Sequence, residues 1–293
     1  MKIEKFPPFK NVIEIDNAAT IRVLSNQESF DRQFKQHNML NRFTLMHTLR
    51  NLSYNGQRFP HMLPLQDETR KKRHTELWNL FNEKASSLHE EAKELDDIAK
   101  WIRRELPDEH PGVYAQQVIG VFFDPEFKAT EQTWEAALIF HEDAVLTNHI
   151  KIAWWWLLKK GDRAKSVLAS STNNNIVAMH GIGIAVHNLV ASLYTLRALY
   201  DITANRTQLT PENAVNASLT APPVVLRQAT IEGIVNGCPF TKYTLFKLKL
   251  KDANRFSDAK DLIFMSNSWS RCPAESWIPA LIAESWRRAT MQQ

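Results

Sequence analysis

Glycine is scarce in this chain, and that scarcity already restricts the fold. The chain has 8 glycines in 293 residues, where a typical share of about 7% would give roughly 20. Glycine supplies the backbone angles that many tight turns need, so a turn-rich all-β fold is disfavoured. We therefore expect a mainly helical protein. Its 44% apolar residues suffice for a sizeable core, which excludes a disordered chain.

Cysteine is rarer still, and no charge of one sign dominates. Cys238 and Cys272 are too few for a disulfide framework, which indicates an intracellular protein. The 36 Lys and Arg residues against 32 Asp and Glu leave a formal charge of +4. Because this charge is mild and the basic residues are interleaved with acidic ones, we predict no nucleic-acid partner.

The chain also lacks the pattern of a leader or a membrane anchor. Its first eight residues, MKIEKFPP, contain no apolar run of the kind that signal peptides need. The most hydrophobic short segment, residues 152–158, is far too short to span a bilayer and is followed by Lys159 and Lys160. We expect a cytoplasmic protein with no membrane partner.

The spacing of apolar residues predicts helices over most of the chain. Alternation typical of strands covers residues 11–15, 21–24, 224–226, 230–231 and 243–246. Helical spacing covers residues 67–106, 131–160, 174–202 and 273–289. The third of these helices is almost wholly apolar from 176 to 190 and is expected to be central and buried. With no repeat or linker, residues 1–293 are predicted to form one domain, mainly α with a small β region.

Cys272 stands at the start of the last expected helix. Proline is favoured at the first helical position, so Cys272 before Pro273 is predicted to be the N-cap, with Glu275 as the third helical residue. The positive end of a helix dipole and its unpaired N–H groups favour a thiolate, which is a nucleophile or a metal ligand. The alternative is a small buried hydrophobic residue. No cysteine-protease signature surrounds Cys272.

Several features precede Cys272 in a particular order. They are Pro222-Pro223-Val224, Arg227, the turn at Gly237, residues 253–258, and Phe264 ahead of the loop that ends at Cys272. This order resembles the C-terminal third of the cytochromes P-450, the haem-thiolate monooxygenases. The Cys-Pro-x-Glu form of residues 272–275 is similar to that of the fatty-acid peroxygenase branch. The resemblance implies a P-450-like helical fold, shortened at both ends, that binds haem b with Cys272 as the iron ligand.

Upstream segments extend the resemblance to residues 11–290. Residues 66–74, QDETRKKRH, look like the family's third helix, whose basic residues contact haem propionates. The resemblance therefore implies that Arg70, Arg73 and Arg227 bind the cofactor, although solvated surface charges are the alternative for Arg70 and Arg73. The apolar helix around His180 is similar to the family's central helix, which crosses the haem.

That helix carries the candidate catalytic residues His180, Gly181, Gly183 and His187. Each helical glycine costs about 1 kcal/mol relative to alanine, so either a flat cofactor or close helix packing should compensate. The two histidines are seven residues apart and are expected on one face, where either could donate or accept a proton near haem. The alternative is a histidine hydrogen-bonded to a neighbouring carbonyl.

The chain departs from the family at three motifs. The Glu-x-x-Arg element is replaced by residues 216–219, NASL, and the loop 264–272 has no glycine and one extra residue. The central helix lacks the acid–alcohol pair that protonates dioxygen, because Ile182 and Ile184 flank Gly183. The resemblance then implies a biosynthetic oxidoreductase of organic substrates that uses peroxide, or an enzyme of rearrangement or dehydration, in place of ordinary monooxygenase chemistry.

Two other functions stay open. A P-450-like protein that has lost haem could serve as a scaffold or activating partner of another enzyme, which the shortened ends and the replaced Glu-x-x-Arg would suit. A helical non-haem metal oxidase could use Glu135, Glu142 and His149, which are spaced by seven on one expected helix, with His141 adjacent.

Shortened ends would also leave apolar surface around a haem pocket. Such surface usually marks an interaction site, so we expect a homodimer or a partner protein that covers part of the pocket. Candidate apolar surface comes from Trp277, Trp286 and the run at residues 154–156. Three consecutive helical tryptophans cannot share one face, so at least one is expected to be exposed or at an interface.

Overall fold

The computed structural model describes most of the chain and divides it into two compact units. The described residues are 2–6, 10–35, 39–91, 93–106, 111–146, 149–202, 209–257 and 259–291. Unit 1 comprises Met1–Glu76 and Ala221–Glu275, and unit 2 comprises Leu77–Thr220 and Ser276–Gln293. Helices predominate and the sheets are small, as the sequence predicted.

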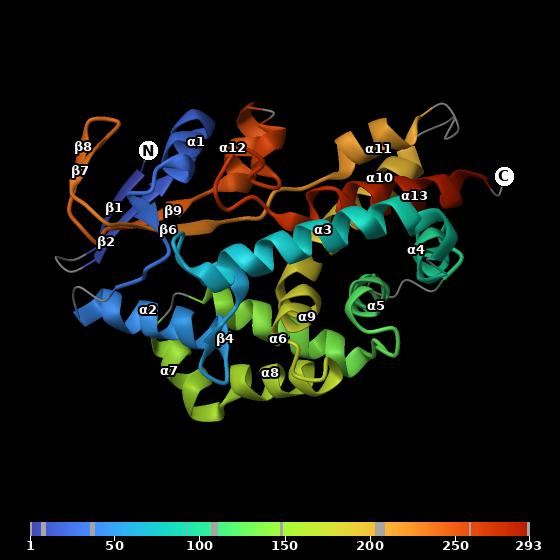
Figure 1. Cartoon of the computed structure of the whole chain (residues 1–293), viewed down its shortest axis with the longest axis horizontal. Helices are drawn as coiled ribbons and strands as arrows, with labels where there is room; N and C mark the ends of the chain where they lie inside the picture. Colours follow the sequence, from blue (N-terminus) through green and yellow to red (C-terminus); the bar gives the residue numbers. More distant parts are fainter. Residues whose placement is uncertain are drawn as a thin grey trace. The chain divides into compact units, whose positions relative to one another are not determined.

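Unit 1 is built on a five-stranded sheet with the order β1-β2-β9-β6-β3. Its strands are β1 (Lys2–Phe6), β2 (Lys10–Ile15), β3 (Phe30–Asp31), β6 (Val225–Ala229) and β9 (Leu245–Leu248). Strands β2 and β9 pair in parallel, and the other neighbours are antiparallel. The blue N-terminal strands therefore lie beside orange strands from the far end of the sequence (Figure 1). On this sheet the rings of Phe30 and Phe246 pack edge to face, 5.0 Å apart.

Short helices and two hairpins complete unit 1. They are α1 (Ala18–Asn26), α2 (Met39–Asn51), η1 (Pro60–Met62), α12 (Leu250–Ser257), η4 (Lys260–Leu262) and η5 (Pro273–Glu275), with the hairpins β4 (Ser53–Tyr54)–β5 (Gln57–Arg58) and β7 (Gly233–Val235)–β8 (Cys238–Phe240). Helix α3 (Glu68–Glu91) begins in unit 1 and continues into unit 2.

The strand predicted at residues 21–24 is wrong, because this segment belongs to α1. Asn17 caps the helix by accepting a hydrogen bond from the backbone N–H of Thr20 at 3.0 Å. Ile21 and Leu24 are buried while Val23 is 54% exposed. This burial follows the 3.6-residue period of a helix. A segment of only four residues is too short for its sequence to distinguish that period from the alternation of a strand.

Unit 2 is helical, and its centre is the apolar segment that the sequence singled out. Its elements are α4 (Glu94–Ile102), α5 (Gly112–Phe123), α6 (Glu131–Val145), α7 (His149–Leu158), α8 (Lys160–Ser171), α9 (Ile176–His180), the π-helical turn η2 (Gly181–Ala185), α10 (Val186–Ile202), α11 (Pro211–Ser218) and α13 (Trp277–Met291). The segment α9–η2–α10 contacts α4, α5, α6, α11 and α13. By length and composition Ile176–Ile202 could cross a membrane, but 61% of its most apolar window is buried in the protein, as in a core helix.

Several predicted boundaries need correction. The helix expected over residues 131–160 is interrupted after Val145, and Lys159 takes a left-handed φ of 51° between α7 and α8. The helix expected over 67–106 is divided into α3 and α4. Residues 230–231 form a bend instead of a strand. Short-range spacing predicts that a segment is helical, but it does not show where one helix ends and the next begins.

Candidate cofactor site

Three arginine side chains in unit 1 surround one indole ring. The guanidinium carbons of Arg227, Arg70 and Arg32 lie 4.7, 4.8 and 5.1 Å from the centroid of the Trp269 ring. The arginines come from three separate places: Arg227 from β6, Arg70 from the first turn of α3, and Arg32 from the residue after β3. Cation–π attraction stabilises each contact by about 0.5–2 kcal/mol, but it leaves the positive charges in place. We call these four residues the arginine cluster.

The arginine cluster carries more positive than negative charge. All three arginines are buried, and Arg227 is completely so. Burial lowers the pKa of Arg227 to about 9 and also lowers the pKa values of Arg32 and Arg70. Across the described residues, Asp31 is the carboxylate whose charge acts on all three guanidinium groups, and Asp67 acts on Arg70. Buried charge in excess of its partners is costly, so the cluster suits an anion.

Hydrogen bonds satisfy only some donors of the cluster. Arg227 donates to the Leu226 carbonyl oxygen at 2.9 Å and to the Ser270 hydroxyl. The Nε atom of Arg227 and the Nε1 atom of Trp269 are buried without a hydrogen-bond partner among the described residues. A buried donor left in this way costs about 1–3 kcal/mol. The cluster therefore has both the charge and the free donors to hold a negatively charged ligand.

Cys272 ends the loop that carries Trp269. Its backbone N–H donates to the Phe264 carbonyl oxygen at 2.8 Å, which closes the loop. The prediction that Cys272 is the N-cap of the last helix is wrong, because residues 273–275 form the 3-10 turn η5 and α13 begins at Trp277. Pro279 gives the reason: in a helix running from Pro273, its ring would clash with the Glu275 carbonyl. Glu275 forms an ion pair with Arg271 instead of a capping box.

The protonation of Cys272 also differs from the sequence prediction. Burial raises the pKa of the Cys272 thiol, the nearby Glu275 charge raises it further, and the backbone N–H of Ala274 opposes them by lowering it. Without the dipole of a full helix, the thiol form is favoured over the expected thiolate. A cysteine that ligates a metal must lose its proton on binding, so a cationic ligand would have to supply the missing stabilisation.

Helix α3 fastens the cysteine loop through side chains of its first two turns. Arg70 donates to the Trp269 carbonyl oxygen, and His74 Nε2 lies 2.9 Å from the Arg271 carbonyl oxygen. Arg70 thus has a structural hydrogen bond in addition to its place in the cluster. Arg73 is half-buried on the same helix and lies outside the cluster, so its role in cofactor binding stays a prediction.

In unit 2, helix packing explains Gly181 and Gly183. A Cβ atom on Gly181 would lie 3.0 Å from Ile119 Cγ2, and one on Gly183 would lie 2.8 Å from both Leu168 Cδ1 and Phe140 Cδ1. These neighbours belong to α5, α8 and α6. The packing alternative therefore accounts for both glycines without a cofactor, and their catalytic role stays a prediction.

The two candidate histidines do not share a face. A π-helical turn holds about one more residue than an α-helical one, and this rotates the following residues by about 100°. The turn η2 lies between His180 and His187. His187 Nε2 lies 3.2 Å from the Ala137 carbonyl oxygen, and its ring packs 4.2 Å from that of His141. His187 thus fits the alternative of a histidine bonded to a carbonyl. Proton transfer by His180 or His187 stays a prediction.

Gln116, which the sequence did not single out, fixes the π turn. It is completely buried on α5. Its Nε2 donates to the carbonyl oxygens of Ile182 at 2.9 Å and Thr133 at 3.0 Å, and its Oε1 accepts from the Thr133 hydroxyl at 2.9 Å. One side chain thus links α5, α6 and the widened turn. A buried polar residue inside an apolar helix was the available signal.

Comparisons with known proteins identify the fold. No family model and no curated protein matches the chain. Among solved structures, cytochrome P450EX alpha with myristic acid matches with a TM-score of 0.61 and 14% identity over 95% of this chain and 80% of that chain. A mutant of P450 EryK with erythromycin B matches with a TM-score of 0.62 and 10% identity, over 98% of this chain and 85% of that chain. A six-coordinated cytochrome P450 from Thermus thermophilus matches with a TM-score of 0.60 and 12% identity, over 94% of this chain and 83% of that chain.

The chain has a cytochrome P450-like fold. This confirms the fold that the motifs before Cys272 suggested, at identities far too low for general sequence similarity to reveal it. Of the arginines that the P450 resemblance implied, the structure brings Arg70 and Arg227 together. Arg32 and Trp269 were missed. Arg32 follows Asp31, which pairs in β3 with Gln228, the neighbour of Arg227, and only that pairing makes it part of the cluster.

The P450-like fold does not assemble the alternative metal site. Helix α6 ends before His149, so Glu135, Glu142 and His149 are not on one helix, and the His149 side chain lies outside the described residues. Glu142 instead forms an ion pair with Lys151 at 2.5 Å. In the described part of the chain, no group of three His, Cys, Asp or Glu side chains is placed to hold a metal ion.

The tryptophans divide between core and surface. Trp154 is 58% exposed while Trp155 is buried, which confirms that the run at residues 154–156 cannot share one environment. Trp277 and Trp286 were expected to supply apolar surface, and this is wrong because both are buried. Trp286 also donates to the Leu209 carbonyl oxygen at 3.0 Å.

Proposed function

We propose that this chain binds haem b through Cys272 and works as a haem-thiolate oxidoreductase in the cytoplasm. The excess positive charge of Arg32, Arg70 and Arg227 carries the proposal. Haem propionates would supply the negative charge and the hydrogen-bond acceptors that the arginine cluster lacks, and iron would supply the positive charge that a Cys272 thiolate needs. Both requirements fall on residues of unit 1.

When bound, a thiolate-ligated haem favours cleavage of an O–O bond, because the thiolate donates electron density to the iron. In the chain itself, the N–H of Ala274 stabilises negative charge on the Cys272 sulfur. Cys272 must release its proton as it binds the metal, so haem binding and proton release are coupled. Arg70 and His74 hold the loop in place through its carbonyl oxygens.

We propose peroxide as the oxidant of an organic substrate, with rearrangement or dehydration as the alternative reaction. Two observations support peroxide, and a third supports an organic substrate. The central helix has isoleucines in place of the acid–alcohol pair, residues 272–275 resemble the peroxygenase form, and P450EX alpha, which matches the fold, was solved with a fatty acid.

Absorbance tests the haem proposal directly. Protein purified from haem-replete cells should show a Soret band, and the ferrous protein with carbon monoxide should absorb where thiolate-ligated haem does. Cys272→Ser should abolish that signature, whereas Cys238→Ser, in the β7–β8 hairpin, should retain it. A folded protein without any Soret band would refute haem binding. An unchanged signature in Cys272→Ser would assign the iron to another residue.

A haem-free scaffold is the second candidate function. The hydrogen-bond contacts that join Arg70 and His74 to the carbonyl oxygens of Trp269 and Arg271 favour it, because they hold the cysteine loop without a cofactor. It predicts a colourless protein whose circular dichroism and thermal unfolding do not change when haem is added.

A further inference from the structure

Helix α7 of unit 2 carries a row of exposed apolar side chains. Ile150, Trp154 and Leu157 are 84%, 58% and 71% exposed. Their spacing of four and three residues places them on one face of the helix. Single exposed apolar residues are common, but three at helical spacing form a stripe. We call these three residues the α7 stripe.

The other face of α7 is held in the core of unit 2. Ile152 is completely buried and Trp155 is 6% exposed. The ammonium groups of Lys151 and Lys160 lie 5.5 and 5.1 Å from the centroid of the Trp155 ring. The buried face fixes the rotation of the helix, so the α7 stripe stays at the surface.

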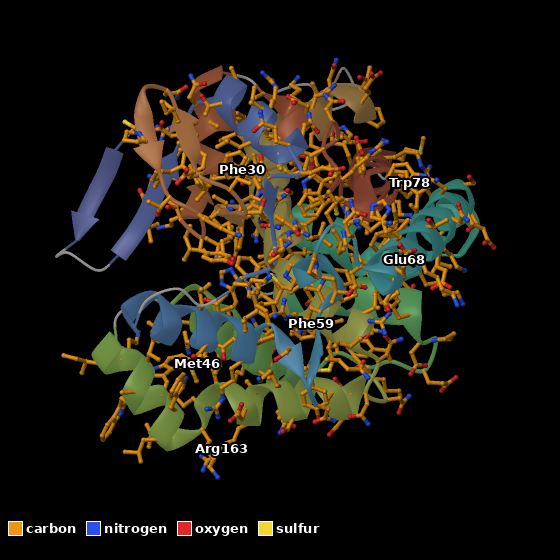
Figure 2. The ribbon with its side chains drawn as sticks, turned by 60° about the vertical axis from the view of Figure 1, so that its left-hand side comes forward. Phe30, Met46, Phe59, Glu68, Trp78 and Arg163 are labelled. Carbon is orange, nitrogen blue, oxygen red and sulfur yellow. The ribbon has the colours of Figure 1, made fainter. Side chains whose placement is uncertain are left out.

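Basic residues flank the α7 stripe. Residues 142–165 contain five Lys or Arg and three Asp or Glu. Lys151, Lys159, Lys160 and Arg163 are exposed, and Figure 2 shows Arg163 pointing away from the ribbon. Of the acids, Asp143 is buried, while Glu142 and Asp162 form ion pairs with Lys151 and Lys165. Lys159, Lys160 and Arg163 thus leave positive charge beside the apolar row.

We propose that the α7 stripe docks on the surface of an anionic lipid membrane, independently of haem binding and in place of the sequence-based expectation of no membrane partner. An apolar row of Ile, Trp and Leu with basic residues beside it is the composition of helices that lie in the membrane interface. Trp154 suits the headgroup level, where indole rings prefer to lie. The lysines and Arg163 would face lipid phosphates, whose negative charge attracts them.

Charge and size argue against a second copy of this chain as the occupant. Two α7 stripes face to face would bring like charges together, which is destabilising. A specific dimer also needs about 1,000 Å² or more of buried surface with matching shape, whereas three side chains form a narrow row. A lipid surface needs neither matching shape nor opposite charge on a second protein.

Vesicle sedimentation of the full chain tests the proposal. The wild-type chain should bind vesicles of phosphatidylcholine with phosphatidylserine and bind pure phosphatidylcholine vesicles far more weakly. Ile150→Ser with Leu157→Ser should reduce binding by at least about tenfold, since it removes two exposed apolar side chains that would enter the lipid surface. Lys159→Gln with Arg163→Gln should reduce binding and its dependence on salt.

Ile234→Ser is the matched control, because Ile234 is 74% exposed on β7 of unit 1. It should leave vesicle binding unchanged, and circular dichroism should show all variants folded. Absence of wild-type binding to anionic vesicles, or equal losses in the control and the stripe variant, would overturn the proposal. So would concentration-dependent self-association in light scattering that the stripe variant abolishes, because the stripe would then bind a second copy.

Discussion

The Arg227 guanidinium lies 4.7 Å from the centroid of the Trp269 ring, and neither Arg227 Nε nor Trp269 Nε1 has a hydrogen-bond partner in the described part of the chain. The Arg227 guanidinium thus lies over the Trp269 ring, and each residue keeps one donor that a ligand could use. This relationship connects the cysteine loop to the sheet of unit 1 and makes a direct prediction about stability and ligand binding.

Arg227→Met should affect the apoprotein and the haem complex in opposite directions. It removes a buried charge whose partners are incomplete, so we expect the free energy of unfolding of the apoprotein to rise by about 1 kcal/mol or more. Haem affinity should fall because one cationic group for the propionates is lost. Urea unfolding and haem titration measure the two effects. Arg255→Met, at an exposed position on α12, should alter neither by much; equal effects of both variants would contradict the assignment.

Cys272 should alkylate slowly at neutral pH. Its pKa is raised, so at pH 7–8 the thiolate fraction is smaller than in the unfolded chain. In a Cys238→Ser background, the rate with iodoacetamide should be lower for the folded apoprotein than for the urea-unfolded one, and should rise with pH. A rate in the folded state above that in the unfolded state would show an activated thiolate.

The same shift predicts a change of stability with pH. The folded state holds the Cys272 proton more tightly than the unfolded state does. The protonated thiol therefore contributes to the free energy of unfolding, and this contribution is fully present below the ordinary thiol pKa. That contribution is lost as the pH rises through the raised value. Apoprotein carrying Cys272→Ser should therefore lose less stability than the wild-type apoprotein in alkaline buffer, as measured by urea unfolding.

Gly183→Ala should destabilise the fold more than Gly181→Ala. A methyl group on Gly183 would meet Leu168 and Phe140 at 2.8 Å, whereas one on Gly181 would lie 3.0 Å from its nearest neighbour. Overpacking costs about 1–3 kcal/mol, against a gain of about 1 kcal/mol in helix propensity. Thermal unfolding measures the difference. A Gly183→Ala variant with unchanged stability but altered haem spectra would instead favour the cofactor explanation.

Gln116→Leu should loosen the π turn. It leaves the Ile182 carbonyl without its buried donor, which costs about 1–3 kcal/mol. Hydrogen exchange at residues 181–185 should increase, and the melting temperature should fall. Gln116→Glu should also destabilise, because a carboxylate cannot donate to the two carbonyl oxygens. Unchanged exchange in both variants would show that the turn is held by the backbone alone.

Local pattern was enough to predict the helical class and the buried central helix. Alternation identified β2, since Ile13 and Ile15 are buried beside half-buried Val12 and Glu14. The Asn-Gly pair at 236–237 lies at the turn expected at Gly237, whereas the pair at 55–56 was an unused signal. All four residues have positive φ, and each pair closes a two-residue hairpin.

The local sequence pattern could not predict that Arg32 and Trp269 belong to the arginine cluster. Arg32 and Trp269 are 237 positions apart in the numbering. Nothing near Arg32 marks it as part of a site, and Trp269 is marked only by its place in the loop that ends at Cys272. Their proximity follows from the antiparallel pairing of β3 with β6 and from the loop that ends at Cys272. The break before α13 was readable in principle, because Pro279 forbids an α-helix that starts at Pro273. The π turn has no comparable signal in one sequence.

The parallel pairing of β2 with β9 has a consequence for the order of folding during synthesis. The register joins Ile13 to Phe246, so the ribosome must make more than two hundred residues before the first strands of unit 1 meet their partner. Residues 77–220 of unit 2 emerge in between, and the hydrogen bonds within their helices join residues close in sequence, which form quickly. We therefore expect the nascent blue strands to need protection from aggregation until the last quarter of the chain arrives.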